Sequence, residues 1–187
     1  MDVIILAGGR SSRMGGRDKS FALWHGKPLI EHSLDFARPR ARHIFISSNK
    51  SPENFARYED VTVIPDPGEL MHTGPLAGIL AGLENTRENW LLTLPVDTPE
   101  LPPALTEELF KAVSVNHAVL AVAAFAGNCQ QVIGLWHRSL APELRAWLEG
   151  GERRVMPFIR QACAPIVDFD HMGKNMNHPS DLAEART

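Results

Sequence analysis

The chain has 187 residues, with 19 lysines and arginines against 22 aspartates and glutamates and a net charge of −3. This length suits one domain with a proper core, and the balanced charge excludes a general electrostatic field for nucleic acids or membranes. Its two cysteines, Cys129 and Cys163, form no CxxC pair, its eight histidines show no i, i+4 zinc pair, and no apolar stretch could span a bilayer. We therefore expect a cytoplasmic protein that binds neither nucleic acid nor membrane.

The first half of the chain alternates short apolar runs with helical patterns. Strands are predicted at 3–6, 21–24, 43–48, 61–64 and 90–94, and helices at 27–37, 74–85 and 103–113. Strands that alternate with helices across short loops predict a mainly parallel sheet covered by helices on both faces. The fold class is therefore α/β, with three α/β/α layers.

The second half is less regular. Paired strands are predicted at 118–125 and 131–136 around a Gly127-Asn128 turn, helices at 140–148 and 155–161, a late strand at 165–169, and a last helix opened by Pro179. No Pro/Gly/Ser-rich linker divides the chain. We expect a single domain, 1–187, in which residues 116–187 supply the acceptor side of a cleft.

Polar residues follow the ends of successive predicted strands. They are the 8–19 loop, Asn49, Asp66 and Asp97. In open α/β sheets, ligands bind outside the carboxyl ends of the strands. Solvation alone does not explain polar residues at so many strand ends, so this edge is predicted to carry the binding site.

The loop at 8–19 combines glycines with fixed positive charges. Glycine allows backbone N–H groups to approach an anion, and Arg13 and Lys19 are spaced to clamp the β- and γ-phosphates of a nucleotide. Gly8, Gly9 and Gly15 would supply backbone contacts. The loop matches neither the Walker nor the Rossmann glycine pattern. The alternative is a glycine-rich turn with solvated basic residues.

Asp97 lies in Pro-Val-Asp-Thr-Pro, at the predicted end of a strand. A lone carboxylate there suits Mg²⁺, which keeps most of its waters and binds few protein oxygens. The alternative is an aspartate that caps the next helix. Asp66, in Pro-Asp-Pro, and Asn49 could hydrogen-bond a base or sugar, and the alternative for both is a residue of a turn.

Several motifs resemble, in order and spacing, those of one enzyme family. Leu-Ala-Gly-Gly-x-Ser-x-Arg-Met-Gly-x-x-x-Lys resembles the signature loop of nucleotidyltransferases that release pyrophosphate from a nucleoside triphosphate. It is followed by Gly74-Pro75-Leu76-Ala77-Gly78, Pro95-x-Asp97-Thr98-Pro99, Gly151-Glu152-Arg153-Arg154-Val155-Met156 and Asn175-x-Asn177-x-Pro179. Together these blocks resemble the molybdenum cofactor guanylyltransferases over nearly the whole chain. The resemblance implies a Rossmann-like nucleotidyltransferase fold that transfers GMP from GTP to molybdopterin, giving molybdopterin guanine dinucleotide and pyrophosphate.

The resemblance also implies a site, with GTP on the 1–115 half and the pterin on the 116–187 half. GTP would contact Leu6, Ala7, Gly8, Gly9, Gly15, Lys19, Asn49, Asp66, Gly74, Gly78 and Asp97. Asp97 would bind Mg²⁺, and the catalytic residues would be Arg13, Lys19 and Asp97. Molybdopterin would contact Arg154, Asn175 and Asn177. The alternatives are a solvated helix start for Arg154 and a helix cap for Asn177.

The implied mechanism is in-line attack by the molybdopterin phosphate on the α-phosphate of GTP. This acceptor is already ionised, so the protein needs neither a nucleophile nor a general base. Related cytidylyltransferases tend to carry Leu-Ala-Ala-Gly, so Leu-Ala-Gly-Gly favours guanine. However, Asn128-Cys129-Gln130-Gln131 stands where family members often have a His-Pro element.

Two other functions stay open. One is a related transferase with another base or acceptor, such as CTP or a sugar phosphate. The other is a GTP-binding accessory protein that delivers cofactor without turnover. In the favoured function, transient protein partners would be molybdenum-insertion proteins and the apoproteins of molybdoenzymes.

Overall fold

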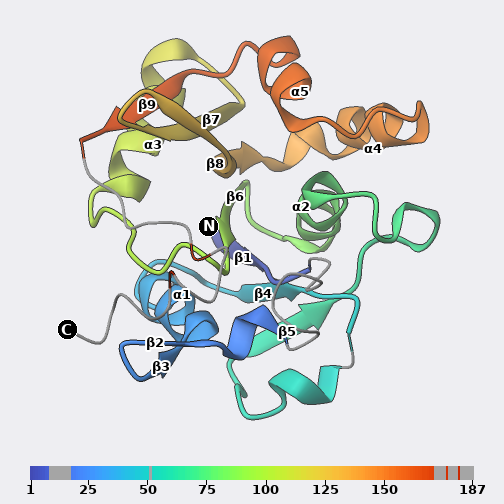
Figure 1. Cartoon of the computed structure of the whole chain (residues 1–187). Coiled ribbons are helices and arrows are strands. Elements are labelled where there is room, and N and C mark those ends of the chain that lie inside the picture. Colours follow the sequence, from blue (N-terminus) through green and yellow to red (C-terminus); the bar gives the residue numbers. More distant parts are fainter. Residues whose placement is uncertain (9–17, 51, 171–175, 177–180, 182–187) are drawn as a thin grey trace.

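A single seven-stranded sheet runs through both halves of the chain in a computed structural model that describes residues 1–8, 18–50, 52–170, 176 and 181 (Figure 1). The strand order is β5-β4-β1-β6-β8-β7-β9. Strand β8 is antiparallel to both of its neighbours, and the other pairs are parallel. The strands are β1 (Asp2–Leu6), β4 (Ile44–Ser47), β5 (Val61–Ile64), β6 (Trp90–Pro95), β7 (Leu120–Phe125), β8 (Asn128–His137) and β9 (Ile166–Phe169).

Helices cover both faces of this sheet, because the strands are apolar on both sides. On one face Val3 and Ile5 of β1 share a core with α1 (Leu29–Ala37) and α3 (Leu105–Asn116). On the other, Ile4 packs in a core with α2 (Pro75–Asn85), α4 (Ala141–Glu149) and α5 (Val155–Gln161). Figure 1 shows these two groups of helices on opposite sides of the strands. The predicted three-layer α/β/α architecture is confirmed.

One predicted helix start is wrong. Residues 27–28 do not open a helix but form β3 (Lys27–Pro28), which pairs with β2 (Leu23–Trp24) in a small hairpin. His25 and Gly26 both have positive φ, 47° and 74°, which is the backbone of a tight hairpin turn. Pro28 is extended (φ −55°, ψ 140°), so α1 begins only at Leu29. The strand predicted at 21–24 is correspondingly shortened.

Among the described residues, short 3-10 turns occur at η2 (Lys19–Phe21), η3 (Pro52–Phe55), η4 (Gly68–Leu70) and η5 (Arg138–Leu140). The turn between β7 and β8 is one residue earlier than predicted, because Ala126 and Gly127 have positive φ of 46° and 76°. The last predicted helix lies largely outside the described residues. Within the described part of the chain, each helix is too short or too polar to cross a membrane.

Candidate active site

The main chains of four neighbouring strands stay hydrogen-bonded at their carboxyl ends. The Ala7 N–H donates to the Ser47 carbonyl (3.0 Å), the Val96 N–H to the Leu6 carbonyl (3.2 Å), and the Ser48 N–H to the Ile64 carbonyl (3.0 Å). The parallel strands β1, β4, β5 and β6 therefore end at one edge of the sheet. The residues that follow them leave the sheet side by side, as the sequence predicts.

Lys19 and Asp97 meet at this edge. Lys19 Nζ lies 2.6 Å from Asp97 Oδ2, and the two side chains are 20% and 24% exposed. Asp97 directly follows the buried Val96 at the end of β6, and it caps no helix, since the N-cap of α3 is Ala104. The helix-capping alternative for Asp97 is therefore wrong. Three of the predicted loop residues, Gly9, Arg13 and Gly15, lie outside the described residues.

Asn49 and Asp66 form a second, reciprocal pair. Asn49 Nδ2 donates to Asp66 Oδ2 (2.7 Å), and Asn49 Oδ1 accepts from the Asp66 N–H (2.9 Å). Asp66 is only 7% exposed, and its carboxylate also accepts from the His72 N–H (3.3 Å) and from Ser47 Oγ (3.4 Å). The sequence predicts Asn49 and Asp66 as site residues, but it does not predict that Ser47 and His72 donate hydrogen bonds to Asp66.

Gly74 and Gly78 bring the start of α2 against this edge. Gly74 has φ +116°, a conformation that L side chains rarely adopt, and leads into Pro75 at the first turn of the helix. A Cβ on Gly78 would lie 2.5 Å from Ser47 Oγ and 3.0 Å from Leu6 Cδ2. Gly78 therefore permits the close approach of α2 to β1 and β4.

The described residues do not form a metal site built from protein ligands alone. Among the residues that the structure describes, no three His, Cys, Asp or Glu side chains come together as ligands for an ion. Mg²⁺, however, usually binds through one or two carboxylates and the phosphates of its substrate. The partly exposed Asp97 carboxylate fits an ion that arrives with a nucleotide.

The comparisons with known proteins identify the family. Residues 3–164 match the family model described as the MobA-like NTP transferase domain. A protein of Aliivibrio salmonicida named molybdenum cofactor guanylyltransferase is 36% identical, over 98% of this chain and 94% of its own length. One of the same name from Shewanella putrefaciens is 35% identical, over 95% of this chain and 91% of its own. The chain belongs to the molybdenum cofactor guanylyltransferase family.

A solved structure agrees on the fold. Molybdopterin-guanine dinucleotide biosynthesis protein A from Archaeoglobus fulgidus superposes with a TM-score of 0.78 at 22% identity, covering 99% of this chain and 96% of that one. The Rossmann-like nucleotidyltransferase fold is thus confirmed. The family match makes the chain a nucleotidyltransferase of molybdenum cofactor biosynthesis.

The Glu152-Arg153-Arg154 block of the family lies between α4 and α5. Glu152 accepts hydrogen bonds from Arg154 Nη2 (2.6 Å), from Arg154 Nε (3.0 Å) and from the Arg153 and Arg154 N–H groups (2.9 and 3.1 Å). These bonds, above all that from the Arg154 side chain, lower the pKa of Glu152 to about 2. Arg153 Nη1 donates to the Leu148 carbonyl at the end of α4. The block organises the α4–α5 connection and leaves the Arg154 side chain 75% exposed.

Met176, one of the described residues of the C-terminal segment, contacts Asp97. The Met176 N–H donates to the Asp97 carbonyl (2.9 Å), and the Met176 side chain is 4% exposed within the α1/α3 core. Asn175 and Asn177, which flank it in sequence, lie outside the described residues. The Asn-x-Asn pattern predicts roles for Asn175 and Asn177. The structure describes the contact of the apolar residue between them, Met176.

Proposed function

We propose that the protein transfers GMP from GTP to molybdopterin, forming molybdopterin guanine dinucleotide and releasing pyrophosphate. Membership of the guanylyltransferase family supports the reaction, and the name of the Aliivibrio salmonicida relative supports the guanine base. The observation that carries the proposal is the Lys19–Asp97 pair, held beside the Asn49–Asp66 pair at one edge of the sheet.

GTP would lie across the strand ends. Its triphosphate would follow Leu6, Ala7 and Gly8 into the loop that carries Gly9, Arg13 and Gly15, towards Lys19. The base or sugar would face Asn49 and Asp66, next to the start of α2 at Gly74 and Gly78. From the part of the chain that the structure describes, Asp66 Oδ1 accepts one long bond, from Ser47 Oγ at 3.4 Å, so it keeps capacity to accept from a guanine N–H or a ribose hydroxyl.

Charge stabilisation would carry most of the catalysis. Lys19 would donate to the pyrophosphate oxygens as negative charge accumulates there, and Arg13 would bind the same group as a two-pronged donor. Mg²⁺ held by Asp97, when bound, would polarise the phosphate oxygens. Since the acceptor is an ionised phosphate, the site would need no general base.

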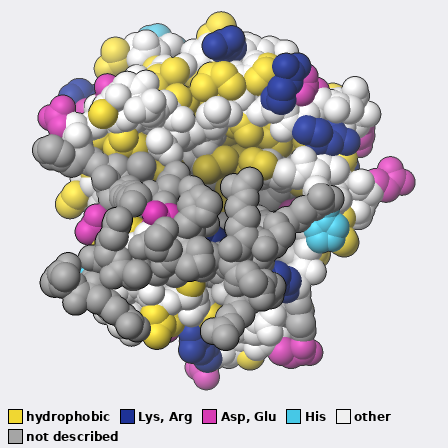
Figure 2. Space-filling view, in the orientation of Figure 1, with side chains coloured by type: hydrophobic (Ala, Val, Ile, Leu, Met, Phe, Trp, Pro, Cys, Tyr) yellow, Lys and Arg dark blue, Asp and Glu magenta, His cyan; other side chains and the backbone are white. Residues whose placement is uncertain are grey.

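The second half of the chain would bind the acceptor. We propose Arg154 for the molybdopterin phosphate, and Asn175 and Asn177 for the pterin, since Met176, which stands between them in sequence, donates its N–H to the Asp97 carbonyl. Figure 2 shows hydrophobic side chains gathered on the upper part of the face in view, over the second half of the chain in Figure 1. An apolar surface suits a planar heterocycle such as a pterin.

Pyrophosphate release tests the proposal. The protein is given Mg²⁺ and molybdopterin, with GTP, CTP and ATP in parallel. Release with GTP alone, and its loss in Asp97→Ala, is the expected result. Release with CTP would contradict the base assignment and keep the chemistry. GTP binding without release from any nucleotide would favour the accessory-protein alternative. Contacts with molybdenum-insertion proteins and apoenzymes, and a cytoplasmic location, stay predictions.

A further inference from the structure

Asp18, which precedes Lys19 in sequence, forms an ion pair with Lys50 to which the family motifs assign no role. Asp18 Oδ2 is 3.1 Å from Lys50 Nζ, and the two side chains are 12% and 36% exposed. Oδ2 is buried and accepts no hydrogen bond of regular geometry from the described residues. The Lys50 ammonium is thus its neighbouring counter-charge, and burying a carboxylate oxygen is costly without one.

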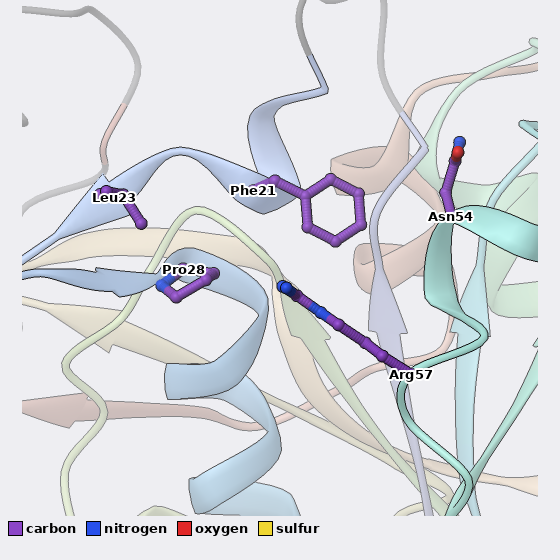
Figure 3. A pocket seen from close by; sticks show the side chains of 5 residues that line it. All are labelled: Phe21, Leu23, Pro28, Asn54 and Arg57. Carbon is purple, nitrogen blue, oxygen red and sulfur yellow. The ribbon is translucent and has the colours of Figure 1, made fainter.

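The other oxygen of Asp18 shapes the turn that carries Lys19. Asp18 Oδ1 accepts from the Ser20 N–H (3.0 Å), which makes Asp18 the N-cap of the 3-10 turn η2. Phe21 anchors the turn on its other side, with its ring 5.4 Å from that of Phe55 and 5.2 Å from the Arg57 guanidinium. Figure 3 shows Phe21 and Arg57 lining a pocket together with Leu23, Pro28 and Asn54.

Lys50 in turn belongs to the chain that leaves β4. It directly follows Asn49, the residue that is paired with Asp66, and its N–H donates to Ser48 Oγ (3.2 Å). Three side-chain contacts, Asn49–Asp66, Lys50–Asp18 and Lys19–Asp97, are therefore joined through the peptide bonds between Asn49 and Lys50 and between Asp18 and Lys19.

We propose that Asp18 and Lys50 form a positioning pair that sets the Lys19 turn relative to the strand end that carries Asn49. The pair acts through Lys19, and its effect on turnover rests on the nucleotidyl transfer proposed above. A displacement of Lys19 by an ångström would weaken its contact with the leaving group, because catalytic groups lose efficiency steeply with misplacement. The pair therefore supports the rate of transfer more than the binding of GTP.

Two substitutions separate the ion pair from the cap. Asp18→Asn removes the negative charge but keeps an oxygen that can accept from the Ser20 N–H, and Lys50→Met removes the positive charge and leaves Asp18 as the N-cap. The matched control is Asp60→Asn, which breaks the exposed Arg38–Asp60 ion pair (2.7 Å, side chains 42% and 47% exposed). The ion pairs and hydrogen bonds described for Arg38 and Asp60 involve neither the Lys19–Asp97 pair nor the Asn49–Asp66 pair. Lys50→Arg keeps the charge and tests for rescue.

The expected result is a split between kcat and KM. Asp18→Asn and Lys50→Met each lower kcat about tenfold and change the KM for GTP less than about threefold. The double variant is no slower than the slower single variant. Asp18→Asn adds little to Lys19→Met, because both act on the same group. Lys50→Arg restores at least about half of the kcat, and Asp60→Asn leaves it unchanged.

Other outcomes overturn the proposal. If Asp18→Asn keeps the kcat of Asp60→Asn, the pair does not position Lys19. If the two losses multiply in the double variant, or if Asp18→Asn still lowers kcat tenfold in the Lys19→Met background, the two residues do not act together through Lys19. Failure of the proposed function itself is recognised separately, because the unsubstituted protein then releases no pyrophosphate.

Discussion

The two edges of the sheet both carry aspartates, and the partners of those aspartates differ. At the amino-terminal edge, Asp2 is fully buried and accepts from Thr86 Oγ1 (2.6 Å) and the His43 N–H (3.1 Å). At the carboxyl edge, Asp97 is a quarter exposed and faces the flexible ammonium of Lys19. Partners fixed in the fold make a carboxylate part of the scaffold. A lysine partner at a partly exposed position leaves a carboxylate that a ligand can reach.

The largest effect is expected from neutralising the exposed aspartate. Asp97→Asn should lower kcat by at least about a hundredfold, since it removes the negative carboxylate that we propose for holding Mg²⁺. Because the Lys19–Asp97 pair is partly exposed, the free energy of unfolding should change by less than about 1 kcal/mol. Pyrophosphate release and thermal unfolding measure the two quantities. Activity within tenfold of the unsubstituted protein would contradict the assignment of Asp97.

The same substitution at the opposite edge should have the reverse effect. Asp2→Asn places an amide donor against the Thr86 hydroxyl or the His43 N–H, and should lower the free energy of unfolding by about 1–3 kcal/mol. The kcat of the folded protein should change less than about twofold, since the site is at the other edge. Chemical denaturation and activity assays on one preparation test this. A large loss of kcat with unchanged stability would refute the contrast between the two edges.

A methyl group at the start of α2 should affect both stability and binding. Gly78→Ala places a Cβ 2.5 Å from Ser47 Oγ and should destabilise the protein by about 1–3 kcal/mol. Because Ser47 donates to Asp66, the KM for GTP should rise as well.

Gly82→Ala is the matched control for Gly78→Ala in the same helix. There the Cβ would meet Leu91 Cδ2 at 2.7 Å and Ile4 Cδ1 at 2.9 Å, within the core. It should cost similar stability and leave the KM unchanged. Equal changes in KM from the two substitutions would show that Gly78 acts only through stability.

The smallest effect is expected in the second half of the chain and depends on pH. The folded-state pKa of Glu152 is about 2, below its ordinary value of 4.5, so its stabilisation is fully present above pH 4.5 and is lost as the pH falls towards 2. Glu152→Gln should therefore lower the melting temperature slightly at pH 7, with the difference from the unsubstituted protein disappearing at low pH. Glu149→Gln, in the neighbouring exposed pair with Arg145, is the control. A difference that persists at pH 2 would contradict this origin.

Much of the fold could be predicted because it depends on local patterns. Apolar runs such as 3–6 and 90–94 identify buried strands, and Gly74-Pro75 marks the start of α2. The second strand of the small hairpin, β3, is the part that the sequence does not predict, because Lys27-Pro28 is equally compatible with a helix start. The left-handed backbone of His25 and Gly26 and the pairing of Lys27 with Trp24 show that residues 27–28 form a strand and do not begin the helix.

The sequence by itself determined the alternation of strands and helices, the family, and the placement of Lys19, Asn49, Asp66 and Asp97 after strand ends. Only the tertiary structure decided which of these residues pair: Lys19 with Asp97 across 78 positions, and Asn49 with Asp66 across 17. It also showed that further residues contact this site or its supporting turn, and no spacing rule in the sequence selects them: Asp18, Lys50, Ser47 and Met176. The physical reason is that strand and turn propensities act between near neighbours in sequence. The partner of a side chain at a strand end depends instead on which strands lie side by side in the sheet.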